Sequence, residues 1–270
     1  MKKSIILLLL FSLSNLAKAD WPVGKKRTNL TPSFTYYYTN RIFGADGKVR
    51  ASPNGDKFTS KTLNFYGVTG LSRRLDLIYN VPIAFITAQN IFVKNTKIGI
   101  ADVWVGLAYH TPSQDLKSFF TVKGQLIIPM YSNTNIPHLG YGSLGAQIAA
   151  NYSFSPKKGS YLVAEGVYTR YFAQQDGPNQ YLLNLTYGKE LASAMLITFT
   201  FNNLISVSAD KTFSNNLNAN KDFTIGKLSG AIGKKISRTV TPYFQTYYTI
   251  YGRNSGLGFG CSLFVSIKIP

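Results

Sequence analysis

The sequence predicts an all-β fold: a transmembrane antiparallel β-barrel of about twelve strands, with short periplasmic turns and longer external loops. Three observations support this prediction. The chain opens with a secretory signal, apolar and polar residues alternate along segment after segment, and short and long connections between these segments tend to alternate.

The N-terminus has the three parts of a secretory signal peptide. Lys2 and Lys3 form a basic start, Ile5–Leu13 is an apolar stretch, and Ala17-Lys18-Ala19 is an A-x-A cleavage site. The apolar stretch is too short to cross a bilayer as a helix, which needs roughly 20 residues. We expect cleavage near Ala19, with 1–19 as signal peptide and 20–270 as one barrel domain; the alternative is an uncleaved anchor.

The alternation is clearest in Gly142–Ser155. Even positions from Leu144 to Phe154 are apolar, whereas odd positions from Ser143 to Ser153 are small or polar. Side chains alternate between the two faces of a strand, so this strand has one apolar and one polar face. Twelve segments share the pattern, and we expect strands near 31–42, 59–71, 75–88, 98–110, 117–131, 141–155, 160–172, 179–190, 194–206, 223–235, 239–251 and 256–269.

The connections between these segments favour a barrel in an outer membrane, where periplasmic turns are short and external loops longer. The predicted periplasmic turns are Ser72–Arg74, Thr111–Leu116, Pro156–Gly159, Leu191–Ser193 and Ile236–Arg238. The predicted external connections are Phe43–Phe58, Gln89–Lys97, Ser132–Gly140, Ala173–Pro178, Val207–Asp222 and the short Gly252–Ser255. An even number of strands places both termini on the periplasmic side.

A soluble β-sandwich would alternate in the same way, but with its apolar face turned inward. The length of the strands favours lipid outside, as does the abundance of tyrosine near strand ends. Candidate tyrosines for a girdle at the lipid head groups are Tyr36, Tyr37, Tyr38, Tyr109, Tyr131, Tyr152, Tyr171, Tyr187, Tyr248 and Tyr251.

The same alternation places polar and charged side chains in the lumen. We expect these to be Asp76, Asn80, Asp102, Trp104, Lys123, Gln125, Gln147, Asn151, Glu165, Asn184, Asn202, Lys227, Gln245 and Lys268. Charges of both signs could line a solvated channel and bias its solutes, or pair across a barrel that they merely fill. Placing Glu165 inside places Arg170 outside, which is tolerated near the rim.

The charge of the chain points to lipid rather than nucleic acid. Loss of Lys2, Lys3 and Lys18 with the signal takes the net charge from +18 to +15. A secretory signal and the spread of basic residues over loops and turns argue against nucleic-acid binding. The expected partners are outer-membrane lipid and lipopolysaccharide, the barrel assembly machinery and an unidentified small solute.

Metal and cofactor chemistry have little support in the sequence. Cys261 is the single cysteine, and His110 and His138 are far apart, so we expect neither a metal site nor a cofactor. His110 heads a predicted periplasmic turn. His138 lies near Ser143 in sequence, a pairing that a lipid-modifying enzyme could use, but no residue is placed to orient the histidine. We therefore expect no catalytic residues.

Several short segments resemble the meta-pathway phenol-degradation-like family of outer-membrane transporters, which is related to long-chain fatty acid transporter-like barrels. They are Trp21 followed by Gly24-Lys25, the stretch from Tyr66 to Leu77, and Gly99–Tyr109, in which Ala101 replaces the family's second glycine. The resemblance implies a barrel that carries small hydrophobic or aromatic compounds. This chain shows no obvious N-terminal plug.

The sequence therefore predicts a Gram-negative outer-membrane barrel that passively transports a small hydrophobic or amphipathic solute. Two alternatives stay open: a lipid-modifying outer-membrane enzyme, and a structural or adhesive barrel with a closed lumen.

Overall fold

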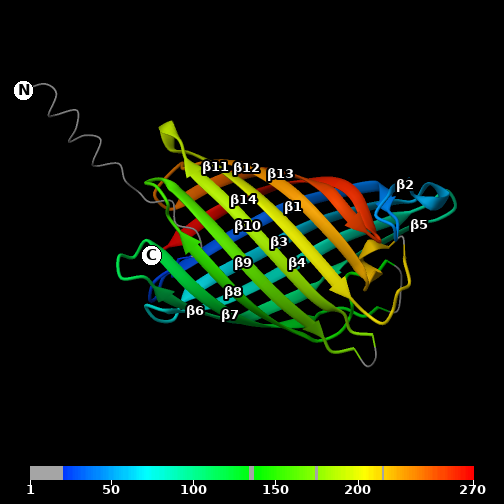
Figure 1. The fold of residues 1–270 in the computed structure, drawn as a ribbon, viewed down its shortest axis with the longest axis horizontal. Coiled ribbons are helices and arrows are strands. Elements are labelled where there is room, and N and C mark those ends of the chain that lie inside the picture. Colours follow the sequence, from blue (N-terminus) through cyan, green and yellow to red (C-terminus); the bar gives the residue numbers. More distant parts are fainter. Residues whose placement is uncertain (1–20, 134–136, 174–175, 215) are drawn as a thin grey trace, which may run out of the picture.

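The computed structural model describes residues 21–133, 137–173, 176–214 and 216–270. They form a closed antiparallel β-barrel of twelve strands, as predicted, in which the last strand pairs with the first (Figure 1). The predicted signal peptide and its cleavage site lie outside the described residues. No helix among the described residues is long and apolar enough to cross a membrane.

Each predicted strand corresponds to a strand of the barrel wall. The strands are β1 (Thr28–Phe43), β2 (Val49–Ala51), β3 (Lys57–Gly70), β4 (Leu75–Gln89), β5 (Lys94–Ile100), β6 (Asp102–Pro112), β7 (Ser118–Pro129), β8 (Gly145–Phe154), β9 (Ser160–Tyr171), β10 (Asn179–Glu190), β11 (Met195–Val207), β12 (Phe223–Lys234), β13 (Val240–Arg253) and β14 (Ser255–Ile269). The short β2 only extends the end of β1, and β5 and β6 together form one wall strand.

The break between β5 and β6 has a local cause. Both segments pair with β4, but the register shifts by one residue between Ile83↔Ile100 and Asn80↔Trp104. Pro82 lies at the break and has no N–H to donate to the ladder, although its carbonyl oxygen accepts from the Ala101 N–H at 2.9 Å. The result is a β-bulge within an otherwise continuous strand.

The two faces of the wall follow the predicted alternation. In β7, Leu126 is 57% exposed and Val122 is also exposed, because both face outward. Ile127 faces inward and is 0% exposed. In β8, Ile148 and Tyr152 face outward and Asn151 is buried on the inner face. The outer surface is thus largely apolar, as expected of a wall that faces lipid.

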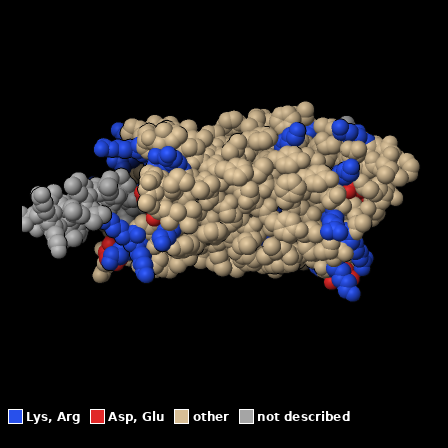
Figure 2. Space-filling model, turned by 90° about the horizontal axis from the view of Figure 1, so that it is seen from above, with Lys and Arg blue, Asp and Glu red and all other residues tan. Residues whose placement is uncertain are grey.

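The two ends of the barrel differ. The terminal end carries Trp21, the C-terminus and the five short turns, and the loop end carries the longer connections (Figure 1). The predicted sixth strand is shorter than expected, because it begins at Gly145 rather than near 141. Lys and Arg gather toward both ends, with a broad band almost free of charge between them (Figure 2).

Candidate functional site: the barrel lumen

The lumen contains a belt of polar side chains on neighbouring strands. Lys123 Nζ on β7 lies 2.9 Å from Glu165 Oε1 on β9, and the Asn184 amide on β10 donates to Glu165 Oε2 at 2.8 Å. The Asn202 amide on β11 in turn donates to Asn184 Oδ1. These residues, all predicted to face inward, therefore form one connected chain of hydrogen bonds along the inner wall.

Other predicted lumen residues also find partners on the inner wall. The Gln147 amide donates to Gln125 Oε1 at 2.9 Å, and the Ser153 hydroxyl donates to Asn151 Oδ1 at 2.9 Å. The Gln245 amide donates to the Ser229 hydroxyl. Asn80 and Trp104 are opposite each other in the β4–β6 register, and Lys268 is exposed near the end of β14, opposite Asn29 on β1.

A buried trio lies near the terminal end. Asp76 is 0% exposed, and its Oδ2 lies 3.0 Å from His110 Nε2, while His110 Nδ1 lies 2.9 Å from the Thr121 hydroxyl. The expectation that His110 belongs to a turn was wrong. It belongs to β6 and faces inward, because the strand continues to Pro112.

The N-terminal segment, defined as Trp21–Arg27, enters the mouth of the barrel at this end. The Val23 N–H donates to Asp76 Oδ2 at 3.1 Å, and the Trp21 ring lies 5.4 Å from the ring of Phe119, which faces inward on β7. A Cβ added at Gly70 would lie 2.0 Å from the Gly24 carbonyl oxygen, so the close approach requires glycine there. The sequence had shown no obvious plug, yet this segment narrows the mouth.

At the loop end, residues 137–141 fold into the barrel. Leu139 is 6% exposed and packs with Phe58, Ala84 and Ile86, which lie on the inner faces of β3 and β4. Tyr141 meets Tyr171 edge-on, with ring centroids 4.7 Å apart. This inward fold explains why strand β8 starts later than predicted.

Asp102 anchors that fold rather than standing free in the lumen. Its Oδ1 accepts from the Tyr131 hydroxyl at 2.8 Å, and the Tyr131 oxygen accepts from the Gly142 N–H at 3.0 Å. Three of the predicted girdle tyrosines, Tyr37, Tyr131 and Tyr171, are therefore inside the barrel and not at a lipid interface. Tyr37 shares its parity in β1 with Thr35 and Thr39, a signal that could have placed it correctly.

A second inward segment, the described part of 208–222, meets the first. Leu217 packs against the Phe58 cluster, and the Asn218 amide donates to the His138 carbonyl oxygen at 3.4 Å. The Tyr141 hydroxyl donates to the Asn220 carbonyl oxygen at 2.9 Å. Contacts between the two segments thus narrow the loop end from within.

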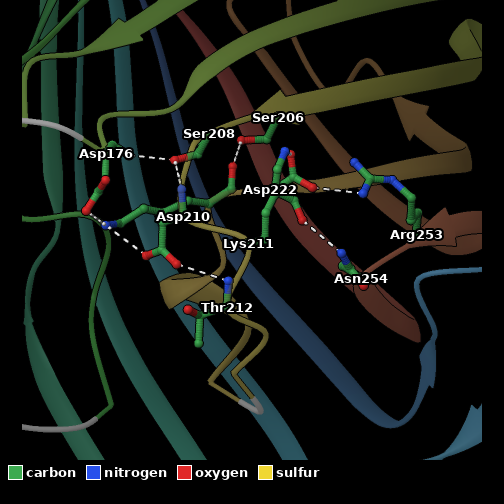
Figure 3. A network of polar contacts seen from close by, with 10 residues as sticks. Asp176, Ser206, Ser208, Asp210, Lys211, Thr212, Asp222, Arg253 and Asn254 are labelled. Carbon is green, nitrogen blue, oxygen red and sulfur yellow. Dashed lines mark hydrogen bonds and ion pairs between the residues drawn. The ribbon is translucent and has the colours of Figure 1, made fainter.

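Asp222 fastens the second segment to the wall (Figure 3). Its side chain is 2% exposed and binds Lys211 Nζ at 2.6 Å and Arg253 Nη1 at 2.8 Å. Burial opposes ionisation of Asp222, but the bonds from these two cations outweigh it and lower the pKa of the carboxyl. Asp222 therefore stays ionised and holds both cations.

Asp210 makes a second attachment within the same segment. The side-chain and backbone hydrogen bonds from Thr212, together with Lys221, lower the pKa of Asp210 to about 2. Lys221 Nζ lies 3.2 Å from Asp210 and 3.8 Å from Asp176, which joins the segment to the preceding loop. This network of loop-end ion pairs is visible in Figure 3.

Lys227 occupies a different environment from Lys123. Its Nζ lies 5.6 Å from the centroid of the Tyr37 ring and 5.5 Å from that of Tyr247. The two rings are near parallel, with centroids 6.1 Å apart. Tyr247 was not predicted as a lumen residue, although it shares its parity in β13 with Gln245, which was.

The possible catalytic pair is not assembled. Within the described ranges, no hydrogen bond joins His138 to Ser143, whose hydroxyl donates to the Tyr141 carbonyl oxygen at 3.3 Å. Burial and the charges of Lys97 and Lys221 lower the pKa of His138. The described residues also contain no group of three or more His, Cys, Asp or Glu side chains that could hold a metal ion.

Comparison with known proteins adds solved structures of the same fold. No protein-family model and no curated protein matches the chain. A COG4313 outer membrane channel from Pseudomonas putida F1 superposes with a TM-score of 0.76 at 12% identity, over 94% of this chain and 100% of that one. The NanC porin gives 0.51 at 12% identity, over 88% and 98%. The translocator domain of the autotransporter NalP from Neisseria meningitidis gives 0.51 at 10%, over 98% and 95%.

At these identities the likeness establishes the fold alone. It agrees with a barrel of the outer-membrane channel kind, and it does not extend to the phenol-degradation-like family that the sequence resembles. The chain therefore has the fold of outer-membrane channel barrels.

Proposed function

We propose that this chain, after removal of a signal peptide near Ala19, is an outer-membrane channel for passive movement of a small hydrophobic or amphipathic solute. The observation that carries the proposal is the polar belt from Lys123 to Asn202 inside a barrel with an apolar outer wall. Eight-stranded barrels are filled by side chains and barrels of 16–18 strands hold aqueous channels, so twelve strands leave an intermediate lumen. As part of this proposal, the terminal end of the barrel faces the periplasm and the loop end faces the outside of the cell.

Because both ends of the lumen are narrowed, the barrel is better suited to passing selected solutes than to free diffusion of any small molecule. The N-terminal segment restricts one mouth, and the two inward segments at the loop end restrict the other. At the loop end, the aromatic rings of Tyr141 and Tyr171 lie beside polar groups such as the Gln180 amide, an arrangement that suits a solute with both apolar and polar parts. Delivery by the barrel assembly machinery and contact of the basic ends with lipid and lipopolysaccharide belong to the same proposal.

Purified mature protein in planar bilayers tests the proposal. We expect discrete conductance steps in KCl, and a Lys123→Ala variant should change their size or ion preference because it removes a charge from the belt. Liposome swelling with solutes of graded size would give the width of the path. Absence of both conductance and solute flux in correctly folded protein would refute a channel and favour a barrel with a closed lumen.

A further inference from the structure

We propose that Lys227, Tyr37 and Tyr247 form a lumen binding site for a small organic anion with a flat apolar body, of which benzoate is a representative. The inference deepens the proposed function and rests on it, since a solute reaches this site only through the lumen. Three strands build the site: Tyr37 comes from β1, Lys227 from β12 and Tyr247 from β13.

The charge of the site is the first argument. Lys123 has Glu165 at 2.9 Å, and Lys235 has Glu190 at 2.7 Å. Lys227 differs: no carboxylate of the described chain lies within ion-pair distance of it, and its contacts are the two tyrosine rings. Lys227 is partly buried, and a partly desolvated cation without an anion is costly, a cost that ring faces offset only in part. A bound carboxylate would supply the missing counter-charge.

The surroundings of Lys227 argue for an organic rather than an inorganic anion. The Tyr37 ring meets the Phe58 ring edge-on at 6.4 Å, and Leu217 packs on the same cluster. Parallel rings and apolar side chains offer nothing to a hydrated chloride or phosphate, but they match the flat face of an aromatic carboxylate. The ammonium group then fixes the polar end of the ligand and the rings fix its body.

Leu217 connects this site to the loop end. It lies on the inward segment that Asp222 fastens to Lys211 and Arg253. A ligand at Lys227 would therefore lie close to this segment and at one end of the polar belt. Asn202, the last residue of that belt, is opposite Lys227 in the β11–β12 register.

The test measures benzoate binding to the full mature protein in detergent by calorimetry. Two comparison ligands are measured in the same way: benzyl alcohol, an uncharged analogue with the same ring, and acetate, a carboxylate without the ring. We expect benzoate to bind more tightly than either. Lys227→Gln should weaken benzoate binding about tenfold or more, because a charge-assisted contact is lost. Tyr247→Leu should weaken it several-fold, and Lys227→Arg should retain most of it because the charge remains.

Lys61→Gln is the matched control, since Lys61 is an exposed lysine on the outer face of β3, and it should bind benzoate as the parent does. Folding of every variant is checked by heat-modifiable migration on gels; if Lys227→Gln does not fold, Tyr247→Leu and Lys227→Arg carry the test. Equal binding of benzoate and benzyl alcohol, or unchanged benzoate binding in folded Lys227→Gln, would overturn the site.

The channel proposal and the anion-site proposal can be refuted independently of each other. A protein that conducts in KCl but does not bind benzoate keeps the channel and loses the anion site. Conversely, benzoate binding that depends on Lys227 in a barrel without conductance keeps the site and refutes the channel.

Discussion

At the scale of single residues, the inner wall separates two kinds of lysine. Lys123 is bonded to Glu165 in a belt that continues through Asn184, so its charge is matched within the wall. Lys227 has the rings of Tyr37 and Tyr247 as neighbours, with its Nζ 5.6 and 5.5 Å from their centroids. The lumen therefore combines a compensated polar surface with a local positive site, and the two can be separated by mutation.

Glu165→Gln should reveal the role of the belt. The change leaves Lys123 without its acid partner, so we expect a stronger preference for anions, measured as a shift in reversal potential across a KCl gradient. Because both side chains are mostly buried, at 12% and 19% exposed, unfolding free energy should also fall by about 1–3 kcal/mol in urea titrations.

The matched control for this change is Asp115→Asn. Asp115 pairs with Lys117 at 3.6 Å in a short turn at the terminal end, where both side chains are exposed. Neither reversal potential nor unfolding should change in this variant. An unaltered reversal potential in Glu165→Gln would show that the belt does not contribute to ion preference.

At the scale of elements, the barrel is narrowed at both ends by segments that are not part of its wall. The N-terminal segment is held at one end by Asp76 and Gly70, and the described part of 208–222 is held at the other by Asp222. The N-terminal segment is held by the Asp76 carboxylate and by two backbone hydrogen bonds at Gly70, and the second segment by ion pairs of a few side chains, so neither attachment is a long strand pairing. We therefore expect them to loosen without unfolding of the barrel.

Gly70→Ala should displace the N-terminal segment. The added Cβ would overlap the Gly24 carbonyl oxygen, a backbone atom that cannot move aside as a flexible side chain would. In a Trp104→Phe background, Trp21 is the one remaining tryptophan, and its emission should shift to longer wavelength while conductance rises. Gly124→Ala is the control, because a Cβ at Gly124 meets no atom within 4 Å; equal effects of both changes would contradict the predicted role of the segment.

Acid should loosen the described part of 208–222 only at low pH. The pKa of Asp210 is lowered to about 2, so its contribution is complete above the unfolded value near 3.9 and is lost as the pH falls through about 2. Pepsin cleavage near Phe213 and Leu217 should therefore be slow at pH 4 and fast near pH 2. Asp210→Asn should be cut readily at pH 4, whereas equal resistance of variant and parent would show that Asp210 does not hold the segment.

At the scale of the whole molecule, the outer wall places apolar residues against lipid. Leu126→Lys should lower the free energy of unfolding by about 1–3 kcal/mol in vesicles, because a cation that faces the hydrocarbon region is costly. Leu191, an exposed residue in a turn at the terminal end, gives the control, since Leu191→Lys places the same charge in water. Equal stability of the two variants would mean that the wall at Leu126 does not face lipid.

Most of the wall could be predicted from sequence because strand faces depend on a local period of two. Gln147, Asn151 and Glu165 face inward as expected, and Arg170 faces outward near the loop end, where its guanidinium donates to Asn179. The predictions failed at residues outside regular strands, where the period-two alternation does not determine whether a side chain points inward or outward. Residues 141–143 leave the wall, and Leu139 and Leu217 turn inward from connections whose sequences carry no alternation.

The sequence by itself determined the barrel class, the strand segments and which side of the wall most residues occupy, because each of these depends on neighbours in the chain. The tertiary structure decided which inward residues meet. Lys123 and Glu165 are 42 residues apart, and Tyr37 and Lys227 come from opposite ends of the chain. Their contacts depend on the register of successive strands and on closure of β14 against β1, which are properties of the whole ring of strands.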